Sequence, residues 1–152
     1  MRRAFIAAAL VLGAASPLAA QPVSKDGPSG GGGWTSLSSL QAWRGYKQES
    51  VPAEWTQESA TTFGKTKGTE DLVSKNQYGD FDLELDWKLS PGGNAGIFYH
   101  ATEEGDKVYW TGPEYQLLDN ARHPDGKNPL TSAGSIYAVY PPAKKVVKPA
   151  GE

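Results

Sequence analysis

The chain has 152 residues, of which 38% are hydrophobic, and it carries 15 basic and 17 acidic side chains. This length suits one ordinary domain. The chain contains no cysteine, which excludes a disulfide framework, a thiol nucleophile and a lipid-anchored lipoprotein. The slightly acidic balance gives no electrostatic reason to expect nucleic acid or an anionic membrane as a partner.

Residues 1–20 have the layout of a signal peptide. Arg2 and Arg3 precede a short apolar run, which passes into small residues and ends at Ala20. The run is too short to span a bilayer as a permanent helix, so we expect cleavage near Ala20 and a secreted or periplasmic protein. Without Arg2 and Arg3 the basic residues fall from 15 to 13 against 17 acidic ones, so the mature net charge is about −4.

Residues 21–33 contain two prolines and end in four consecutive glycines. This composition is typical of a flexible linker. A glycine run can also bind phosphate, but that requires a strand before it and a helix after it. Neither pattern is present, so the linker interpretation is favoured and the domain is predicted over residues 34–152.

From Trp34 onward the pattern is that of an all-β domain. Residues 81–89 alternate apolar and charged side chains, as in a strand with one face in a core and one in water. Turn residues follow at 90–94, and residues 95–101 read as a second strand, so the two are predicted to pair as a hairpin. Further strands are expected at residues 114–119 and 135–140, with shorter ones at 43–46, 55–57 and 72–74. Short strands separated by turns favour a sandwich or a barrel.

Several motifs then occur in a fixed order between Trp34 and the last residue. They are DLVSK from Asp71, YGDF from Tyr78, SPGGNAGIFY from Ser90, TGPEYQ from Thr111, HPDGKN from His123, SAG from Ser132 and KPAGE from Lys148. Together they resemble the 3-keto-disaccharide hydrolase family, formerly a domain of unknown function. The resemblance implies a concanavalin-like jelly-roll sandwich of two antiparallel sheets, one of them concave. It also implies an exported bacterial protein that acts on sugars whose C3 hydroxyl is oxidised to a ketone.

The chain departs from the family pattern at two places. Family members continue beyond the final KPAGE block with further strands, so we expect the jelly-roll domain to be incomplete at its C-terminus. The family's opening Phe-Asp-Gly-Lys turn is replaced here by the shorter LSSL at residues 37–40. The resemblance therefore gives no prediction for the pairing of the first strand.

Strand alternation assigns the residues around Glu114 to two faces. Glu114, Gln116 and Leu118 share one face, while Tyr115 and Leu117 share the other and suit the core. With the resemblance, we expect Glu114 and Gln116 to line the concave face. A carboxyl in partly apolar surroundings titrates high enough to serve as a catalytic acid or base. The alternative is an exposed glutamate on a solvated face.

The polar stretch 119–132 is long enough to be a functional loop, although a plain surface excursion fits equally. His123 is our first candidate there for a general acid or base, because histidine suits proton transfer at neutral pH. Asp119 is the candidate that orients His123 or converges with it on the substrate. Six residues are candidates for substrate binding, namely Tyr99, His100, Trp110, Gln116, Arg122 and Lys127. Solvated surface charge is the alternative for Arg122 and Lys127, and a structural histidine is the alternative for His100.

No cofactor is firmly implied. Asp119, Asp125 and Asn128, together with Asn120, are weak candidates for Ca²⁺ ligands, although their spacing does not match an EF-hand loop. Two histidines and no cysteine make a conventional zinc site unfavourable.

The resemblance predicts a hydrolase that cleaves 3-keto-disaccharides or 3-keto-glycosides, with a small oxidised sugar as its partner. A ketone at C3 acidifies the hydrogen on C2, so a base can remove it while an acid assists departure of the C1 substituent, and water then adds. Direct hydrolysis by Glu114 and Asp119 is the competing mechanism. A non-catalytic carbohydrate-binding module, with Trp110, Tyr99 and Tyr137 as stacking platforms, is the alternative function. A structural extracellular domain without a ligand is a third.

Overall fold

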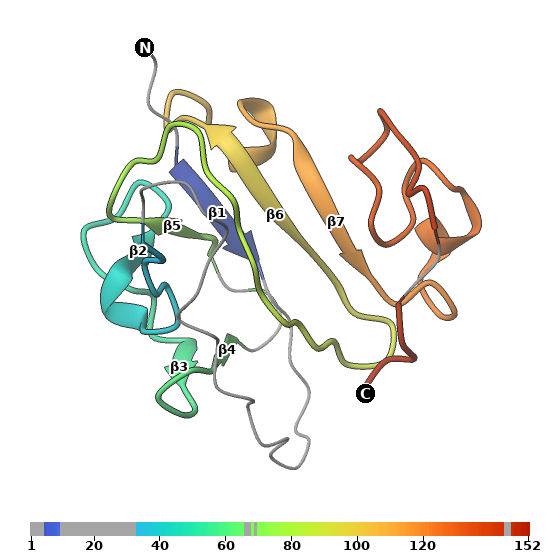
Figure 1. Cartoon of the computed structure of the whole chain (residues 1–152), viewed down its shortest axis with the longest axis horizontal. Helices are drawn as coiled ribbons and strands as arrows, with labels where there is room; N and C mark the ends of the chain where they lie inside the picture. Colours follow the sequence, from blue (N-terminus) through green and yellow to red (C-terminus); the bar gives the residue numbers. More distant parts are fainter. Residues whose placement is uncertain (1–4, 10–32, 66–67, 69, 145–146) are drawn as a thin grey trace.

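The computed structural model describes residues 5–9, 33–65, 68, 70–144 and 147–152 (Figure 1). Most of the predicted signal peptide and all of the predicted linker except Gly33 lie outside the described residues. The described part is all-β, with seven strands in two antiparallel sheets. Its helices are single 3-10 turns, and within the described residues none is long or apolar enough to cross a membrane.

The larger sheet has five strands in the order β2-β5-β1-β6-β7. These strands are β2 (Trp43–Gly45), β5 (Leu72–Ser74), β1 (Phe5–Ala9), β6 (Asn94–Ala101) and β7 (Glu114–Leu118). The N-terminal strand β1 lies in the middle of the sheet, with β5 on one side and β6 on the other (Figure 1). Strands far apart in the sequence are thereby joined into one sheet.

The smaller sheet pairs β3 (Trp55–Gln57) with β4 (Phe63–Lys65). It packs on the larger sheet through aromatic rings, because the ring centroid of Phe63 lies 5.9 Å from that of Trp43 on β2. The remaining elements are the 3-10 turns η1 (Leu40–Ala42), η2 (Val108–Trp110) and η3 (Pro124–Lys127). The two antiparallel sheets packed through side chains confirm the predicted β-sandwich class.

Buried side chains cover both faces of the larger sheet. One cluster consists of Trp43, Trp55, Leu72, Leu89, Ala95, Ile97 and Leu117. The other consists of Tyr46, Val73, Phe98, Ala101 and Val108. Ile97 and Phe98 are neighbours on β6 and so point to opposite faces, and each belongs to a different cluster. We call these the Ile97 face and the Phe98 face.

The predicted strand at residues 81–89, and its hairpin with residues 95–101, are wrong for this structure. The segment has no strand structure, and Leu83 and Leu85 remain 39% and 44% exposed. The physical reason is that β1 already pairs with the edge of β6 that a hairpin would use. The turn itself forms, since the Gly93 N–H donates to the Ser90 carbonyl at 2.8 Å. Gly92 has a φ of 75°, which suits the third position of a type II turn after proline.

The other strand predictions have mixed outcomes. The strands at 55–57 and 72–74 are confirmed, as are those near 43–46, 95–101 and 114–119 with slightly different ends. The prediction at 135–140 is wrong, because Ile136 makes only isolated bridges to Tyr115 and Tyr140. Ala138 has a φ of 60° and reverses the chain there, so the segment hydrogen-bonds to itself. β4 (Phe63–Lys65) was not predicted.

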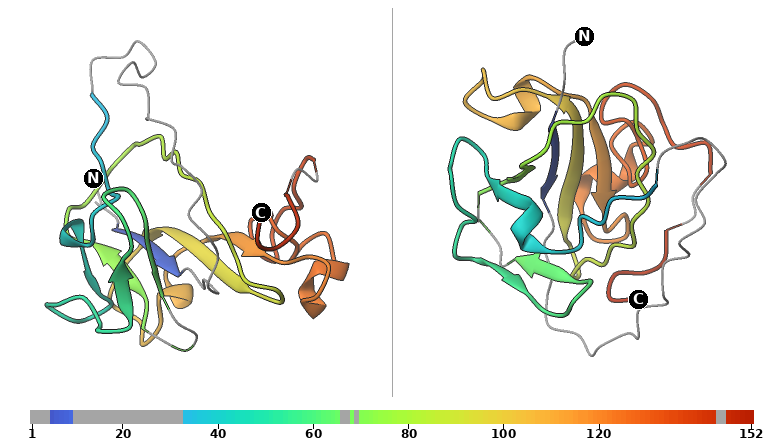
Figure 2. Two further views of the ribbon diagram at one scale, coloured as in Figure 1. Left: turned by 90° about the horizontal axis from the view of Figure 1, so that it is seen from below. Right: turned by 60° about the vertical axis from the view of Figure 1, so that its left-hand side comes forward.

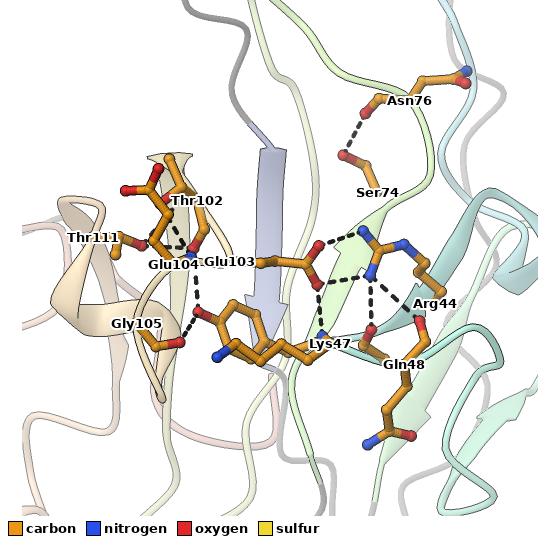
Figure 3. A network of polar contacts seen from close by, with 12 residues as sticks. Arg44, Lys47, Gln48, Ser74, Asn76, Thr102, Glu103, Glu104, Gly105 and Thr111 are labelled. Carbon is orange, nitrogen blue, oxygen red and sulfur yellow. Dashed lines mark hydrogen bonds and ion pairs between the residues drawn. The ribbon is translucent and has the colours of Figure 1, made fainter.

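A polar network ties β2 to the loop after β6 (Figure 3). Arg44 donates two hydrogen bonds to the Glu103 carboxylate, both 2.7 Å long. The Lys47 N–H donates to the same carboxylate at 2.6 Å. The Tyr46 hydroxyl donates to the Gly105 carbonyl at 2.7 Å. These bonds hold the 102–107 loop over the Phe98 face.

Candidate functional site

Glu114, the first residue of β7, carries a partly buried carboxyl group with a strongly raised pKa. Its side chain lies directly over Gly96 of β6, where any Cβ atom would collide with the carboxyl oxygen Oε1. Glycine at position 96 therefore provides the space for Glu114. The carboxyl group is only partly exposed, and burial raises its pKa to about 7, with the negative charge of Asp71 adding to the effect.

Asp71 is a second carboxyl group that acts on Glu114. It immediately precedes β5, and burial raises its pKa, while Lys65 and Lys107 oppose the rise. Two carboxyls that both disfavour ionisation can divide acid and base roles between them. Sequence reasoning missed Asp71 as a site residue. The available signal was its place directly before a short apolar strand.

Tyr137 joins Glu114 to the loop that follows β7. The Tyr137 N–H donates to the Glu114 carbonyl at 2.9 Å, and the Tyr137 hydroxyl donates to Asp125 Oδ2 at 3.4 Å. Burial raises the pKa of Tyr137, and the charge of Asp125 adds to it. Tyr137 was predicted only as a stacking platform, and the structure places it beside the candidate catalytic carboxyl.

His123 lies next to Asp125 rather than in contact with the Asp119 carboxylate. Its Nδ1 accepts a hydrogen bond from the Asp125 N–H at 3.3 Å and lies 3.9 Å from Asp125 Oδ2. An accepting Nδ1 leaves the ring proton on Nε2. A series of hydrogen bonds thus connects the Glu114 backbone to His123 through Tyr137 and Asp125.

Asp119 has a structural position. Its carboxylate accepts hydrogen bonds from the Gly92 N–H at 2.8 Å and the Ala121 N–H at 3.0 Å. The bond from Gly92 is the main reason why the pKa of Asp119 is lowered. Asp119 therefore fixes the turn between residues 90 and 94 against the start of the polar loop. This position differs from the predicted role beside His123.

Gln116 is buried rather than open to a ligand. Its Nε2 donates to the Thr131 carbonyl at 3.3 Å, while its Oε1 is buried without a hydrogen-bond partner among the described residues. Residues 131–135 cover it, since the Gln116 N–H donates to Ser135 and the Gly134 N–H donates to Gln116. Leu117 is in the core as predicted, whereas Tyr115 is 41% exposed and not in the core.

Tyr99 and His100 line a separate cleft of about 470 Å³, together with Gly79, Asp80, Phe81 and Ile136. His100 has a φ of 53°, an uncommon conformation for a residue with a Cβ, and its ring lies 5.8 Å from the Tyr99 ring. Ile136 pairs with Tyr115, the neighbour of Glu114 on β7. Because neighbouring residues of a strand point to opposite faces, the cleft and Glu114 lie on opposite sides of the sheet.

Three remaining candidates are exposed. Trp110 is 71% exposed and its ring centroid lies 5.1 Å from that of Tyr109. Arg122 and Lys127 are exposed in the polar loop. Val108 anchors the η2 turn in the Phe98 cluster, so the Tyr109–Trp110 pair lies on the same side of the sheet as Glu114.

Three of the candidate Ca²⁺ ligands, Asp119, Asn120 and Asn128, accept hydrogen bonds from backbone N–H groups. Among the described residues no group of three or more His, Cys, Asp or Glu side chains is placed to hold a metal ion. The Asn128 Oδ1 accepts from the Leu130 N–H, and the Asn120 Oδ1 accepts from the Ala133 N–H. The Asn128 contact closes a local turn, whereas the contacts of Asn120 with Ala133 and of Asp119 with Gly92 join segments that are 13 and 27 residues apart.

Two comparisons with known proteins place the chain in a family. Residues 33–152 match the model of the 3-keto-alpha-glucoside-1,2-lyase-like domain. The chain is also 37% identical over 134 residues to a 3-keto-disaccharide hydrolase of Bacteroides thetaiotaomicron. That match covers 74% of this chain and 46% of the relative, so the chain spans less than half of the relative's length. The predicted resemblance is confirmed, and the chain belongs to the 3-keto-alpha-glucoside-1,2-lyase-like domain family.

Proposed function

We propose that this chain belongs to an exported enzyme that cleaves the glycosidic bond of 3-keto-disaccharides, with Glu114 as the central catalytic group. One observation carries the proposal. Glu114 lies half-buried against Gly96, with a pKa of about 7. A carboxyl group with such a pKa is present in both protonation states at neutral pH, which suits proton transfer in either direction. The names of the family and of the relative supply the substrate class.

The chemistry proposed is elimination followed by hydration. A base removes the hydrogen from C2, and the electron pair of the C–H bond forms the C1=C2 double bond. The C1–oxygen bond breaks, and an acid protonates the leaving oxygen. Water then adds its hydroxyl group to C1 and a proton to C2, so the net reaction is hydrolysis.

Glu114 and His123 are the residues proposed for the acid and base roles. Asp125 lies beside His123 and accepts a hydrogen bond from the Tyr137 hydroxyl. Tyr137 in turn donates its backbone N–H to the Glu114 carbonyl. For direct hydrolysis by two carboxylates, Asp71 is a better partner of Glu114 than Asp119. Both oxygens of Asp119 are engaged by backbone donors, whereas Asp71 acts on Glu114 electrostatically.

The test is turnover of a 3-keto-glucoside in D₂O, followed by NMR. Elimination predicts that deuterium from the solvent appears at C2 of the released 3-keto-glucose. Glu114→Gln is expected to abolish both release and deuterium incorporation while sugar binding is retained. Release without deuterium at C2 would favour direct hydrolysis. Full activity in Glu114→Gln would remove Glu114 from the mechanism.

The exposed Tyr109–Trp110 pair favours a second function, carbohydrate binding without catalysis. Flat aromatic rings in water are suited to stack on sugar rings, and Trp110 is 71% exposed. In this case Trp110→Ala loses sugar binding and Glu114→Gln has no effect on it. Turnover separates the two functions, because Glu114→Gln loses turnover with binding retained if the chain is an enzyme, whereas calorimetric titration of both variants shows which residue carries the binding.

A further inference from the structure

We infer that the cleft beside Tyr99 and His100 is a binding site for a ligand that carries a quaternary ammonium group. The cleft has a volume of about 470 Å³ and is lined by Gly79, Asp80, Phe81, Tyr99, His100 and Ile136. A cleft of this size suits a small molecule. It lies on the other side of the sheet from Glu114, so the inference does not rest on the proposed activity.

The backbone of β6 is irregular at His100. In the pairing with β1, Ala101 lies opposite Phe5 and Phe98 lies opposite Ala7. Three steps along β6 therefore match two steps along β1, which is the mark of a β-bulge. His100 has a φ of 53°, in the left-handed region that glycine usually occupies in such bulges. Backbone strain of this kind collects at functional sites, where bulges re-aim side chains.

The bulge brings two consecutive side chains to one cleft. Neighbouring residues of a regular strand point to opposite faces, yet Tyr99 and His100 both line the cleft. Their ring centroids are 5.8 Å apart with 68° between the planes, and the Phe81 ring lies 6.3 Å from that of His100 at 50°. His100 is exposed, and Tyr99 and Phe81 are partly exposed. Ring surface is therefore available to a ligand from three directions.

The charge of the cleft favours a cation. Among the described residues that line it, Asp80 is the one carboxylate, and no lysine or arginine is present. Asp80 directly precedes Phe81, on the segment that arches past β6 (Figure 2). The faces of aromatic rings attract cations within about 6 Å of the ring centre, and a carboxylate beside them adds to this attraction.

The arrangement of the lining favours a quaternary ammonium group over other ligands. A primary ammonium group has three N–H donors that need acceptors, whereas the cleft offers mainly three rings, one carboxylate and the side chain of Ile136. A sugar stacks on one flat aromatic face, whereas rings at 50° and 68° to one another enclose a rounded group. A quaternary ammonium group donates no hydrogen bond and is held by ring faces, as in aromatic cages.

NMR titration of the full chain with choline tests the inference. The ring signals of Phe81, Tyr99 and His100 should move, and the methyl signals of choline should shift upfield because they lie over ring faces. The matched probe is the neutral isostere of choline, in which a carbon atom replaces the nitrogen, and it should bind at least about tenfold more weakly. Equal binding of the two probes would overturn the inference, as would ring signals that stay in place throughout the titration.

Variants at three positions assign the binding to this cleft. Asp80→Asn keeps the shape and removes the charge, so it should weaken choline binding about threefold. Asp82→Asn, at the next exposed carboxylate of the segment, is the matched control and should leave the affinity unchanged. Tyr99→Leu removes one ring and should weaken binding about tenfold. Equal effects of the two aspartate variants would contradict the assignment, because general negative charge would then attract the cation.

His100→Gly separates the backbone of the bulge from the ring. Glycine adopts the left-handed conformation without strain, so the variant should keep the circular dichroism spectrum of the unaltered chain and bind choline about fivefold more weakly. Undiminished binding by the folded variant would show that the bulge does not serve this site. Glucose is the last probe and should leave the three ring signals in place. Movement as large as that with choline would assign the cleft to sugars and refute the inference.

Discussion

At the scale of single residues, the surroundings of two carboxyl groups shift their pKa values in opposite directions. The pKa of Glu114 is raised because the side chain is partly buried and the negative charge of Asp71 acts on it. The pKa of Asp119 is lowered because its carboxylate accepts hydrogen bonds from backbone N–H groups. The first group suits proton transfer and the second suits a fixed turn. Both were predicted as catalytic, because the sequence does not show which backbone donors surround a carboxylate.

The raised pKa of Glu114 predicts a specific dependence of stability on pH. Its pKa is about 7 in the folded chain, whereas the ordinary pKa of a glutamate is 4.5. The folded state therefore holds the proton more tightly, and this stabilisation is complete below pH 4.5 and lost as the pH rises to about 7. Glu114→Gln should raise the free energy of unfolding at pH 8 by about 2–3 kcal/mol. Urea unfolding at pH 8 and pH 4 measures this, and an equal difference at both values would contradict it.

Asp119 gives the opposite pH dependence. A carboxylate with a lowered pKa stabilises the folded state above its unfolded pKa, and the stabilisation is lost as the pH falls through its folded pKa. Asp119→Asn should lower the free energy of unfolding at pH 7 by about 1–3 kcal/mol, because a charged acceptor of two backbone N–H groups is lost. The deficit should shrink toward pH 2 in the same urea series. A deficit that is unchanged at low pH would mean that shape rather than charge fixes the turn.

Gly96 is predicted to be irreplaceable for a steric reason. In Gly96→Ala the new methyl group would occupy the position of the Glu114 carboxyl, so the side chain must move or the strands must separate. We expect a loss of about 1–3 kcal/mol of stability together with loss of turnover. The double variant Gly96→Ala with Glu114→Ala should recover stability but not turnover. Failure to recover stability would place the collision elsewhere.

At the scale of elements, the Arg44–Glu103 pair connects β2 to the loop after β6 (Figure 3). The hydrogen bonds from Arg44 hold the pKa of Glu103 below its usual value. Glu103→Gln should lower the free energy of unfolding at pH 7 by about 1.5–3 kcal/mol, the range for hydrogen bonds to charged groups. Glu104→Gln, at the exposed neighbouring position, is the matched control and should change stability little. Thermal unfolding of the two variants compares them directly, and equal losses would argue against the pair.

The comparison of sequence and structure is also most informative for elements. Strands β3, β5, β6 and β7 were predicted because apolar runs between turns restrict the backbone locally. Residues 81–89 have the clearest strand pattern in the chain, yet β1 occupies the place beside β6. Alternation shows that a segment can be a strand, whereas its partner depends on which segment reaches the edge. The pattern at 135–140 failed for a local reason, the reversal at Ala138.

The site was predictable to the same limited degree. Period-two alternation correctly separated Glu114 from Leu117, and the position of Glu114 on β7 follows from it. Asp71 was not found, because it precedes β5 whereas Glu114 lies on β7, and the two strands β1 and β6 separate them in the sheet. Gln116 was expected on an open face, but residues 131–135 fold over it. Coverage by a loop leaves no periodic signal.

At the scale of the whole molecule, the two faces of the larger sheet carry different features. The Phe98 face carries Glu114, the Tyr109–Trp110 pair and the loop held by Glu103. The Ile97 face carries the larger core cluster and the cleft beside His100. The chain spans 46% of the length of the relative that it matches.

The central claim is that Glu114 performs proton transfer on a 3-keto-glycoside. The measurement that tests it most directly is the turnover number of Glu114→Gln on a 3-keto-disaccharide, beside Glu58→Gln at an exposed position just after β3. The account predicts a loss of about a hundredfold or more for Glu114→Gln and normal turnover for Glu58→Gln, with both variants folded by circular dichroism. Turnover of Glu114→Gln within a few-fold of the unaltered chain would contradict it.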